Sequence, residues 1–134
     1  MLRKITKEDL EFARKLRNAN RDYFFDSYKI DRETHLAWFT ASQLDPDFEF
    51  YIIWDGKKRV GTISAHSTME TVEVGNIIID KKYRKKGYFK KAIKELLNIY
   101  QDKQAFLKVI PTNKTAIKAY EAIGFKEKER ILWM

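Results

Sequence analysis

The clearest hydrophobic pattern of the chain lies between Asn76 and Tyr100. Ile77 to Ile79 form a β-branched run that is typical of a buried strand. The apolar residues that follow recur at the spacing of one helix face, at positions 88, 89, 92, 93, 96, 97 and 100. The pattern therefore predicts a strand, a polar turn that contains Gly87, and then an amphipathic helix.

Weaker patterns on either side of this segment predict the other elements. Apolar runs predict strands at 2–5, 48–54, 60–66, 72–79 and 105–110, with a last strand or pair of strands between 125 and 133. Capping residues predict helices from Thr6 to about Asn18, from Asp31 to about Leu44, and from Thr112 or Asn113 to Ile123, before Gly124. The order βααβββαβα, followed by β, predicts one α/β (α+β) domain over residues 1–134. We expect a mixed, mostly antiparallel sheet with helices on both faces.

The positive charge of the chain is concentrated in residues 81–94. This segment contains eight basic residues and no acidic one, and the rest of the chain has 19 of each. A helix N-terminus offers unpaired N–H groups, and a preceding glycine lets the backbone approach a ligand closely. The segment therefore predicts an anion site, most naturally for phosphate, at Gly87. A solvated lysine surface is the alternative interpretation.

Composition narrows the classes of function. The chain has 134 residues, 44% of them hydrophobic, and no cysteine, which excludes disulfides, thiolate metal sites and a cysteine nucleophile. The His, Asp and Glu residues show no metal-ligand spacing, so we expect no metal. No apolar run approaches membrane-spanning length, and we expect a cytoplasmic protein without a membrane partner. A pI near 9.6 raises nucleic acid as a partner, but the local confinement of the charge argues against it.

Two motifs in this order resemble those of the GNAT superfamily of acetyl-CoA-dependent N-acetyltransferases. The stretch Arg84-Lys85-Lys86-Gly87-Tyr88-Phe89 resembles the pyrophosphate motif, with Phe89 where the family most often has Gly or Ala. The spacing of Asn113, Ala116, Tyr120 and Gly124-Phe125 is similar to the C-terminal motif. The pattern around Leu16-Arg17-Asn18 looks like the broad branch that includes ribosomal-protein N-terminal and amino-sugar acetyltransferases.

The resemblance implies a binding site for acetyl-CoA. Its pyrophosphate would lie on the backbone of Arg84, Lys85, Lys86, Gly87, Tyr88, Phe89 and Lys90. Backbone N–H groups around Ile78 and Ile79 would face the acetyl carbonyl. Asn113 could bind the pantetheine arm or a nearby backbone group, and Ala116 would allow its close approach.

The resemblance also implies two catalytic residues. Glu73 matches the position of the base in histone-acetylating members, and Tyr120 could donate a proton to the leaving thiolate. Period-two alternation predicts that Glu73, Gly75, Ile77 and Ile79 share one strand face, with Asn76 on the other. A solvent-exposed carboxylate at 73 and a core tyrosine at 120 are the structural alternatives.

The predicted function is transfer of acetyl from acetyl-CoA to a primary amine, by direct attack in a ternary complex. We expect a small acceptor such as an amino sugar or amino acid derivative, in a pocket formed by residues 20–28, the meander ends and the C-terminal strand. A protein N-terminus or lysine is an alternative acceptor. A non-catalytic domain that binds CoA or nucleic acid is another alternative. A monomer and a homodimer that pairs through the apolar last strand both remain open.

Overall fold

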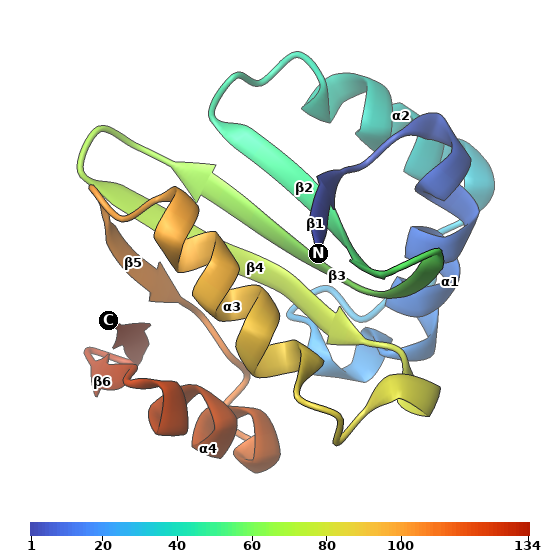
Figure 1. The fold of residues 1–134 in the computed structure, drawn as a ribbon. Coiled ribbons are helices and arrows are strands. Elements are labelled where there is room, and N and C mark those ends of the chain that lie inside the picture. The colour runs from blue at the N-terminus through green and yellow to red at the C-terminus, as the bar shows by residue number, and fades with distance from the viewer.

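A seven-stranded sheet runs through the molecule, and helices cover both of its faces (Figure 1). The computed structural model describes all 134 residues. The helices are α1 (Leu10–Ala19), α2 (Arg32–Ser42), α3 (Tyr88–Ile99) and α4 (Lys114–Ile123). The strands are β1 (Leu2–Lys4), β2 (Phe48–Asp55), β3 (Lys58–Ser67), β4 (Thr71–Ile79), β5 (Gln104–Leu107), β6 (Lys126–Lys128) and β7 (Ile131–Trp133). Short 3-10 turns lie at Lys7–Asp9, Arg21–Tyr23 and Lys81–Tyr83. The predicted order of elements is confirmed.

The strands are ordered β1-β2-β3-β4-β5-β7-β6 across the sheet. Only β4 and β5 are parallel, so the sheet is mostly antiparallel, as predicted. The last strand, β7, pairs with β5 on one side and with β6 on the other. It therefore has no free edge within this sheet, and the choice between a monomer and a homodimer stays a prediction.

Each face of the sheet has its own hydrophobic core. On one face, Ile93 and Leu96 of α3 pack with Tyr120 of α4 in a cluster of 16 buried residues. On the other face, Ala13 of α1 packs with buried residues of β2, and Trp38 of α2 lies against this smaller cluster. The division confirms the prediction of helices on both faces. No helix of the chain is both long and apolar enough to cross a bilayer.

The sheet opens between β4 and β5. These strands pair only through Thr71–Glu73 and Gln104–Phe106, at one end of both strands. The predicted strand at 105–110 is too long, because β5 ends at Leu107 and the chain then leaves the sheet. The rest of β4 therefore has no strand partner on this side, and its backbone is open to a ligand.

A β-bulge in β4 overturns the predicted alternation of its side chains. Thr62 pairs with Ile78 while Ser64 pairs with Gly75, so two residues of β4 lie opposite one residue of β3. Ile77 and Ile79 consequently face the α3 core rather than the face of Glu73.

The bulge also brings the Asn76 side chain to the face of β4 that carries Glu73. Asn76 has a positive φ of 51°, and its Nδ2 donates to Ser64 Oγ at 2.8 Å. Ser64 pairs with Gly75, two residues from Glu73 on the same side of β4. The prediction that Asn76 points away from Glu73 is therefore wrong.

Candidate active site

The turn before α3 presents a run of free backbone donors. No hydrogen bond within the chain uses the N–H groups of residues 85–90. The N-cap residues of α2 and α4, Asp31 and Asn113, fill the same position with side-chain oxygens that accept from the first turn. At α3 the N-cap is Gly87, which has no side chain to do so. These donors are consequently available to an anion.

The conformation of this turn depends on two residues with positive φ. Gly87 has φ 87°, a left-handed conformation that suits glycine, and Lys85 has φ 63°. A Cβ at Gly87 would meet no atom within 4 Å. The space over the backbone at this position is therefore open on the side where a side chain would project.

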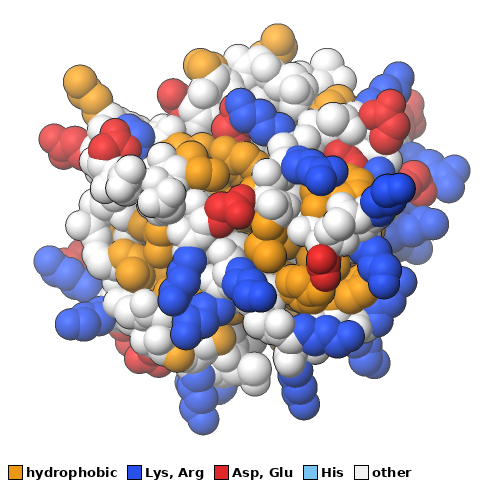
Figure 2. Space-filling view, viewed as in Figure 1, with side chains coloured by type: hydrophobic (Ala, Val, Ile, Leu, Met, Phe, Trp, Pro, Cys, Tyr) orange, Lys and Arg blue, Asp and Glu red, His pale blue; other side chains and the backbone are white.

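The basic residues around the turn carry unneutralised charge. None of the eight between 81 and 94 forms an ion pair. Figure 2 shows basic side chains across the lower half and right-hand edge of the face that carries α3, α4 and this turn. The local potential is positive and adds screened attraction for an anion to the directional N–H groups.

Arg84 uses its guanidinium within the protein. Its Nε donates to the carbonyl oxygen of Ile79 at 3.0 Å, and its Nη2 donates to Asn20 Oδ1 at 2.8 Å. The side chain thus links the end of β4 to the end of α1, and the Arg84 backbone forms part of the turn.

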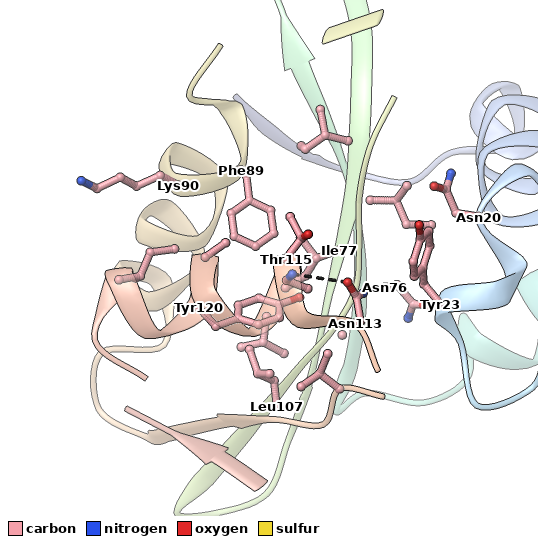
Figure 3. Close-up of a pocket in the computed structure, with 18 of the residues that line it drawn as sticks. Asn20, Tyr23, Asn76, Ile77, Phe89, Lys90, Leu107, Asn113, Thr115 and Tyr120 are labelled. Carbon is pink, nitrogen blue, oxygen red and sulfur yellow. Dashed lines mark hydrogen bonds between the residues drawn. The ribbon is translucent and has the colours of Figure 1, made fainter. Parts of the chain in front are cut away.

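The first turn of α4 lies across the opening from β4. Asn113 Oδ1 accepts a hydrogen bond from the N–H of Ala116 at 3.3 Å, so Asn113 caps the helix (Figure 3). Of the two predicted partners of Asn113, this is the nearby backbone group. Asn113, Ala116 and Tyr120 all line the opening, as their helical spacing predicts.

Tyr120 combines a buried ring with an unpaired hydroxyl. The ring packs against Phe89 at 5.2 Å and Phe125 at 5.9 Å between centroids. The side chain is 7% exposed, and its hydroxyl, which forms no hydrogen bond within the chain, points into the cavity in Figure 3. Burial raises the pKa of the phenol well above its usual value of 10. The hydroxyl therefore keeps its proton at neutral and mildly alkaline pH.

Glu73 lies where β4 and β5 begin to separate. It is the last residue of β4 that pairs with β5, opposite Phe106, and it pairs with His66 on β3. The carboxylate is half-buried and forms no ion pair or hydrogen bond within the chain. His66 itself lies 3.3 Å from Asp45, between Nε2 and Oδ2. Glu73 is therefore the free carboxylate at this end of the opening.

One cavity of about 1020 Å³ brings these features together. Of the site residues predicted from sequence, only Lys86 does not line it; those that do are Glu73, Ile78, Ile79, Arg84, Lys85, Gly87, Tyr88, Phe89, Lys90, Asn113, Ala116 and Tyr120. In Figure 3, Phe89 and Tyr120 lie on one side of β4, and Asn20 and Tyr23 lie on the other. The cavity thus passes from the α3 side through the open sheet to the α1 side.

Sequence reasoning missed part of the lining. Asn76 was assigned to the wrong face because period-two alternation does not anticipate the bulge. Thr115 was given no role, and Thr112 was named only as a possible helix cap. Tyr23, Phe24 and Phe25 lie within the segment predicted to form the acceptor pocket, whereas the C-terminal strand does not reach this cavity. A signal that could have indicated Asn76 is its type, since asparagine adopts positive φ more readily than branched residues.

Residues 13–125 match the family model of the acetyltransferase (GNAT) family. The chain belongs to this family. A spermidine N-acetyltransferase from Vibrio cholerae, solved with CoA and spermine, has a similar fold at 20% identity, with a TM-score of 0.87 over 100% of this chain and 94% of that chain. A domain from Methanocaldococcus jannaschii is similar at 20% identity, with a TM-score of 0.80 over 99% of this chain and 94% of that one. Among curated proteins, no sequence matches this chain.

Membership of the GNAT family makes this chain an acyltransferase with acetyl-CoA as acetyl donor. The residues present fit that donor, because the free N–H groups of 85–90 suit a pyrophosphate and the open sheet beside Ile78 suits an extended chain. Phe89 packs on Tyr120 and is directed away from the turn backbone (Figure 3). No cluster of three or more His, Asp or Glu residues is arranged to hold a metal ion.

Proposed function

We propose that this acetyltransferase transfers its acetyl group to the primary amine of a small molecule, by direct attack in a ternary complex. The observation that carries the proposal is the continuity of the cavity. It joins the anion-binding turn on the α3 side to a free carboxylate and an aromatic wall on the α1 side. Both substrates would then meet where β4 and β5 separate.

The turn and α4 are proposed to hold the donor. Acetyl-CoA supplies a thioester carbonyl that accepts the nucleophile. The N–H groups of 85–90 would bind its pyrophosphate, with Gly87 allowing close approach, and Lys85 and Lys90 would add attraction of roughly 0 to 1 kcal/mol each at the surface. Backbone N–H groups of β4 near Ile78 and Ile79 would donate toward the reacting carbonyl oxygen.

Glu73 is proposed to accept a proton from the amine, and Tyr120 to donate one to the leaving thiolate. An amine must lose a proton to attack, and the free Glu73 carboxylate can accept it directly or through one water. The sulfur of the departing CoA gains negative charge, which the protonated Tyr120 hydroxyl can neutralise by donating a proton. The raised pKa of this phenol keeps the donor form populated.

The acceptor side favours a cationic or neutral amine with an apolar portion. Glu73 is the only acidic residue that lines the cavity, and Tyr23, Phe24 and Phe25 supply aromatic surface at the α1 end. An ammonium group is attracted by carboxylates and by aromatic faces alike. The Vibrio cholerae structure contains spermine, so polyamines join amino sugars and amino acid derivatives as acceptors to test.

The test is release of free thiol from acetyl-CoA in the presence of a panel of amines. The panel holds polyamines, amino sugars, amino acid derivatives and a short peptide with a free N-terminus. Acetylation of a small amine with a kcat/KM at least tenfold above that for the peptide is expected. Preference for the peptide would favour the protein-acetylating alternative, and binding of acetyl-CoA without turnover of any amine would overturn the proposal.

Glu73→Gln tests the proposed base. General-base catalysis contributes about 100-fold or more, so kcat at pH 7 should fall by about that factor while the affinity for acetyl-CoA stays the same. Glu70→Gln is the matched control, because Glu70 lies three residues earlier on the chain, is exposed and does not line the cavity. Equal kinetics for the two variants would remove Glu73 from the mechanism.

A further inference from the structure

The turn before α3 is hydrogen-bonded to the end of α1 through one side chain, that of Arg84. The two guanidinium bonds of Arg84 reach the Ile79 carbonyl and Asn20 Oδ1, at 3.0 Å and 2.8 Å. No other hydrogen bond joins residues 80–90 to residues 10–30. The guanidinium is a rigid planar donor, so the positions of its two acceptors are coupled.

Asn20 is held so that its amide oxygen accepts from Arg84. The residue is buried at the end of α1, and its Nδ2 donates to the Leu16 carbonyl at 2.9 Å. With the amide nitrogen committed to the helix, the amide oxygen must face Arg84. The orientation of Asn20 is thus fixed by the helix, and Arg84 is positioned against it.

The aromatic wall of the acceptor side begins directly after Asn20 and is anchored on the same helix. Arg17 stacks over the Phe24 ring at 3.7 Å and donates from Nη2 to the Asp26 carbonyl at 2.5 Å. Asn18 holds the end of the segment through two bonds of 2.8 Å to the backbone of Ile30. Residues 21–30 therefore follow the end of α1, and the end of α1 is linked to the turn.

We propose that Asn20 and Arg84 form a positioning pair that couples the cofactor turn to the acceptor wall. Occupation of the turn stabilises the arrangement in which Arg84 reaches Asn20, and that contact in turn orders residues 21–26. By linkage, a ligand on the acceptor side then binds more tightly to the acetyl-CoA complex than to the free protein. This coupling rests on the proposed function, because it takes acetyl-CoA as the ligand of the turn.

The first measurement is the dissociation constant of acetyl-CoA by calorimetry, for the wild type, Asn20→Ala, Arg84→Lys and the double variant. Arg84→Lys keeps the positive charge but lacks the planar guanidinium that donates to two acceptors at once. Asn20→Ala should weaken binding about three- to tenfold, the range expected for one lost hydrogen bond. Arg84→Lys should weaken it at least as much, because it also loses the bond to the Ile79 carbonyl. The double variant should be no weaker than the weaker single one, because both changes remove the same contact. If the losses of binding free energy in the two single variants added up in the double variant, the proposal that Asn20 and Arg84 act as a pair would be wrong.

Asn18→Ala is the matched control. It removes the same amide from the same helix end, but its partner is Ile30 and not the turn. Its dissociation constant for acetyl-CoA should stay within twofold of the wild type. A loss equal to that of Asn20→Ala would mean that general loosening of the helix end, and not the contact with Arg84, weakens the site.

The second measurement is amide hydrogen exchange of residues 21–26 with and without acetyl-CoA. Saturating acetyl-CoA should slow exchange in the wild type, and this slowing should be largely lost in Asn20→Ala at equal saturation. Slowing that persists in Asn20→Ala would show that the ligand orders the wall by direct contact, and would overturn the coupling. Absence of acetyl-CoA binding to the wild type would refute the cofactor site itself, which separates the two failures.

Discussion

Gly87 is the residue on which the proposed anion site most depends. It has φ 87° and leaves open space where a side chain would lie. Gly56, in the β2–β3 hairpin, shares these properties with φ 59° but lies outside the cavity. The two glycines therefore separate the cost of backbone strain from the effect on a ligand.

Gly87→Ala and Gly56→Ala should each lower the free energy of unfolding by about 1 kcal/mol, since alanine is strained at positive φ. Only Gly87→Ala should lower the affinity for acetyl-CoA, because the added methyl group would lie between the ligand and the N–H groups of the turn. Urea unfolding and calorimetric titration of both variants check the prediction. Equal affinity in both would mean that the turn does not contact the donor.

Tyr120 predicts a pH dependence of stability. Its pKa is raised by burial in the folded state, while the unfolded phenol titrates near 10. Above pH 10 the unfolded chain loses this proton and the folded chain keeps it, so stability falls as pH rises. Tyr120→Phe should remove this contribution, which totals about 1.4 kcal/mol between pH 9 and 11. Urea unfolding between pH 9 and 11 measures it, and parallel curves for the two proteins would contradict it.

The site residues differ in how far sequence could predict them. Gly87 and the helix face of Asn113, Ala116 and Tyr120 follow from local patterns, because a turn and a helix are determined by residues close in the chain. The partner of Arg84 could not be predicted, since Asn20 lies 64 residues away. The packing of Phe89 on Tyr120 could not be predicted either, because these residues lie on different helices that are distant in the chain.

At the scale of elements, β4 contains the decisive irregularity. The bulge at Asn76 reverses the alternation beyond it and turns the Asn76 side chain toward Ser64. Thr62 Oγ1 donates to the Asn76 carbonyl at 2.7 Å, so two side chains of β3 support the bulge. The shape of the opening consequently depends on a residue that can adopt positive φ.

Replacement of Asn76 tests this dependence. Asn76→Val should lower the free energy of unfolding by about 2 to 3 kcal/mol, because a β-branched residue is strained at φ 51° and the bond to Ser64 is lost. Asn76→Gly keeps the backbone conformation and should lose about 1 kcal/mol. Urea unfolding gives both values, and catalytic turnover should follow the same order. A valine variant as stable as the glycine variant would count against the strained bulge.

The extent of β5 was overestimated for a related reason. Residues 105–110 have strand-like composition, and propensity continues the strand up to Pro111. The structure ends it at Leu107 because pairing with β4 stops at Phe106 and pairing with β7 stops at Leu107. Strand length here is decided by the partner, which propensity does not describe.

At the scale of the whole molecule, the excess positive charge lies beside the cavity, and this distinguishes two partners. Acetyl-CoA would use both the charge and the directional donors, whereas nucleic acid would use the charge alone. At a free concentration of 100 times Kd, acetyl-CoA should add about 2.7 kcal/mol to the free energy of unfolding. The midpoint of thermal unfolding should then rise by several degrees.

A short DNA duplex provides the comparison. Any affinity for the duplex should fall steeply between 50 and 200 mM salt, and acetyl-CoA should displace the duplex from the protein. A duplex that stays bound beside acetyl-CoA would support a second, nucleic-acid-binding role for the lysines.

Local patterns in the chain were enough to predict the order of elements, the amphipathic helix after Gly87 and the cluster of positive charge, because each depends on residues close together in the sequence. Its two motifs also sufficed to indicate the family. The folded structure was needed to locate the separation of β4 and β5, the face on which Asn76 lies, and the contact between Arg84 and Asn20. These features arise from strand pairing and side-chain contacts between distant segments, where the free energy of the whole sheet outweighs the local preference of any one residue.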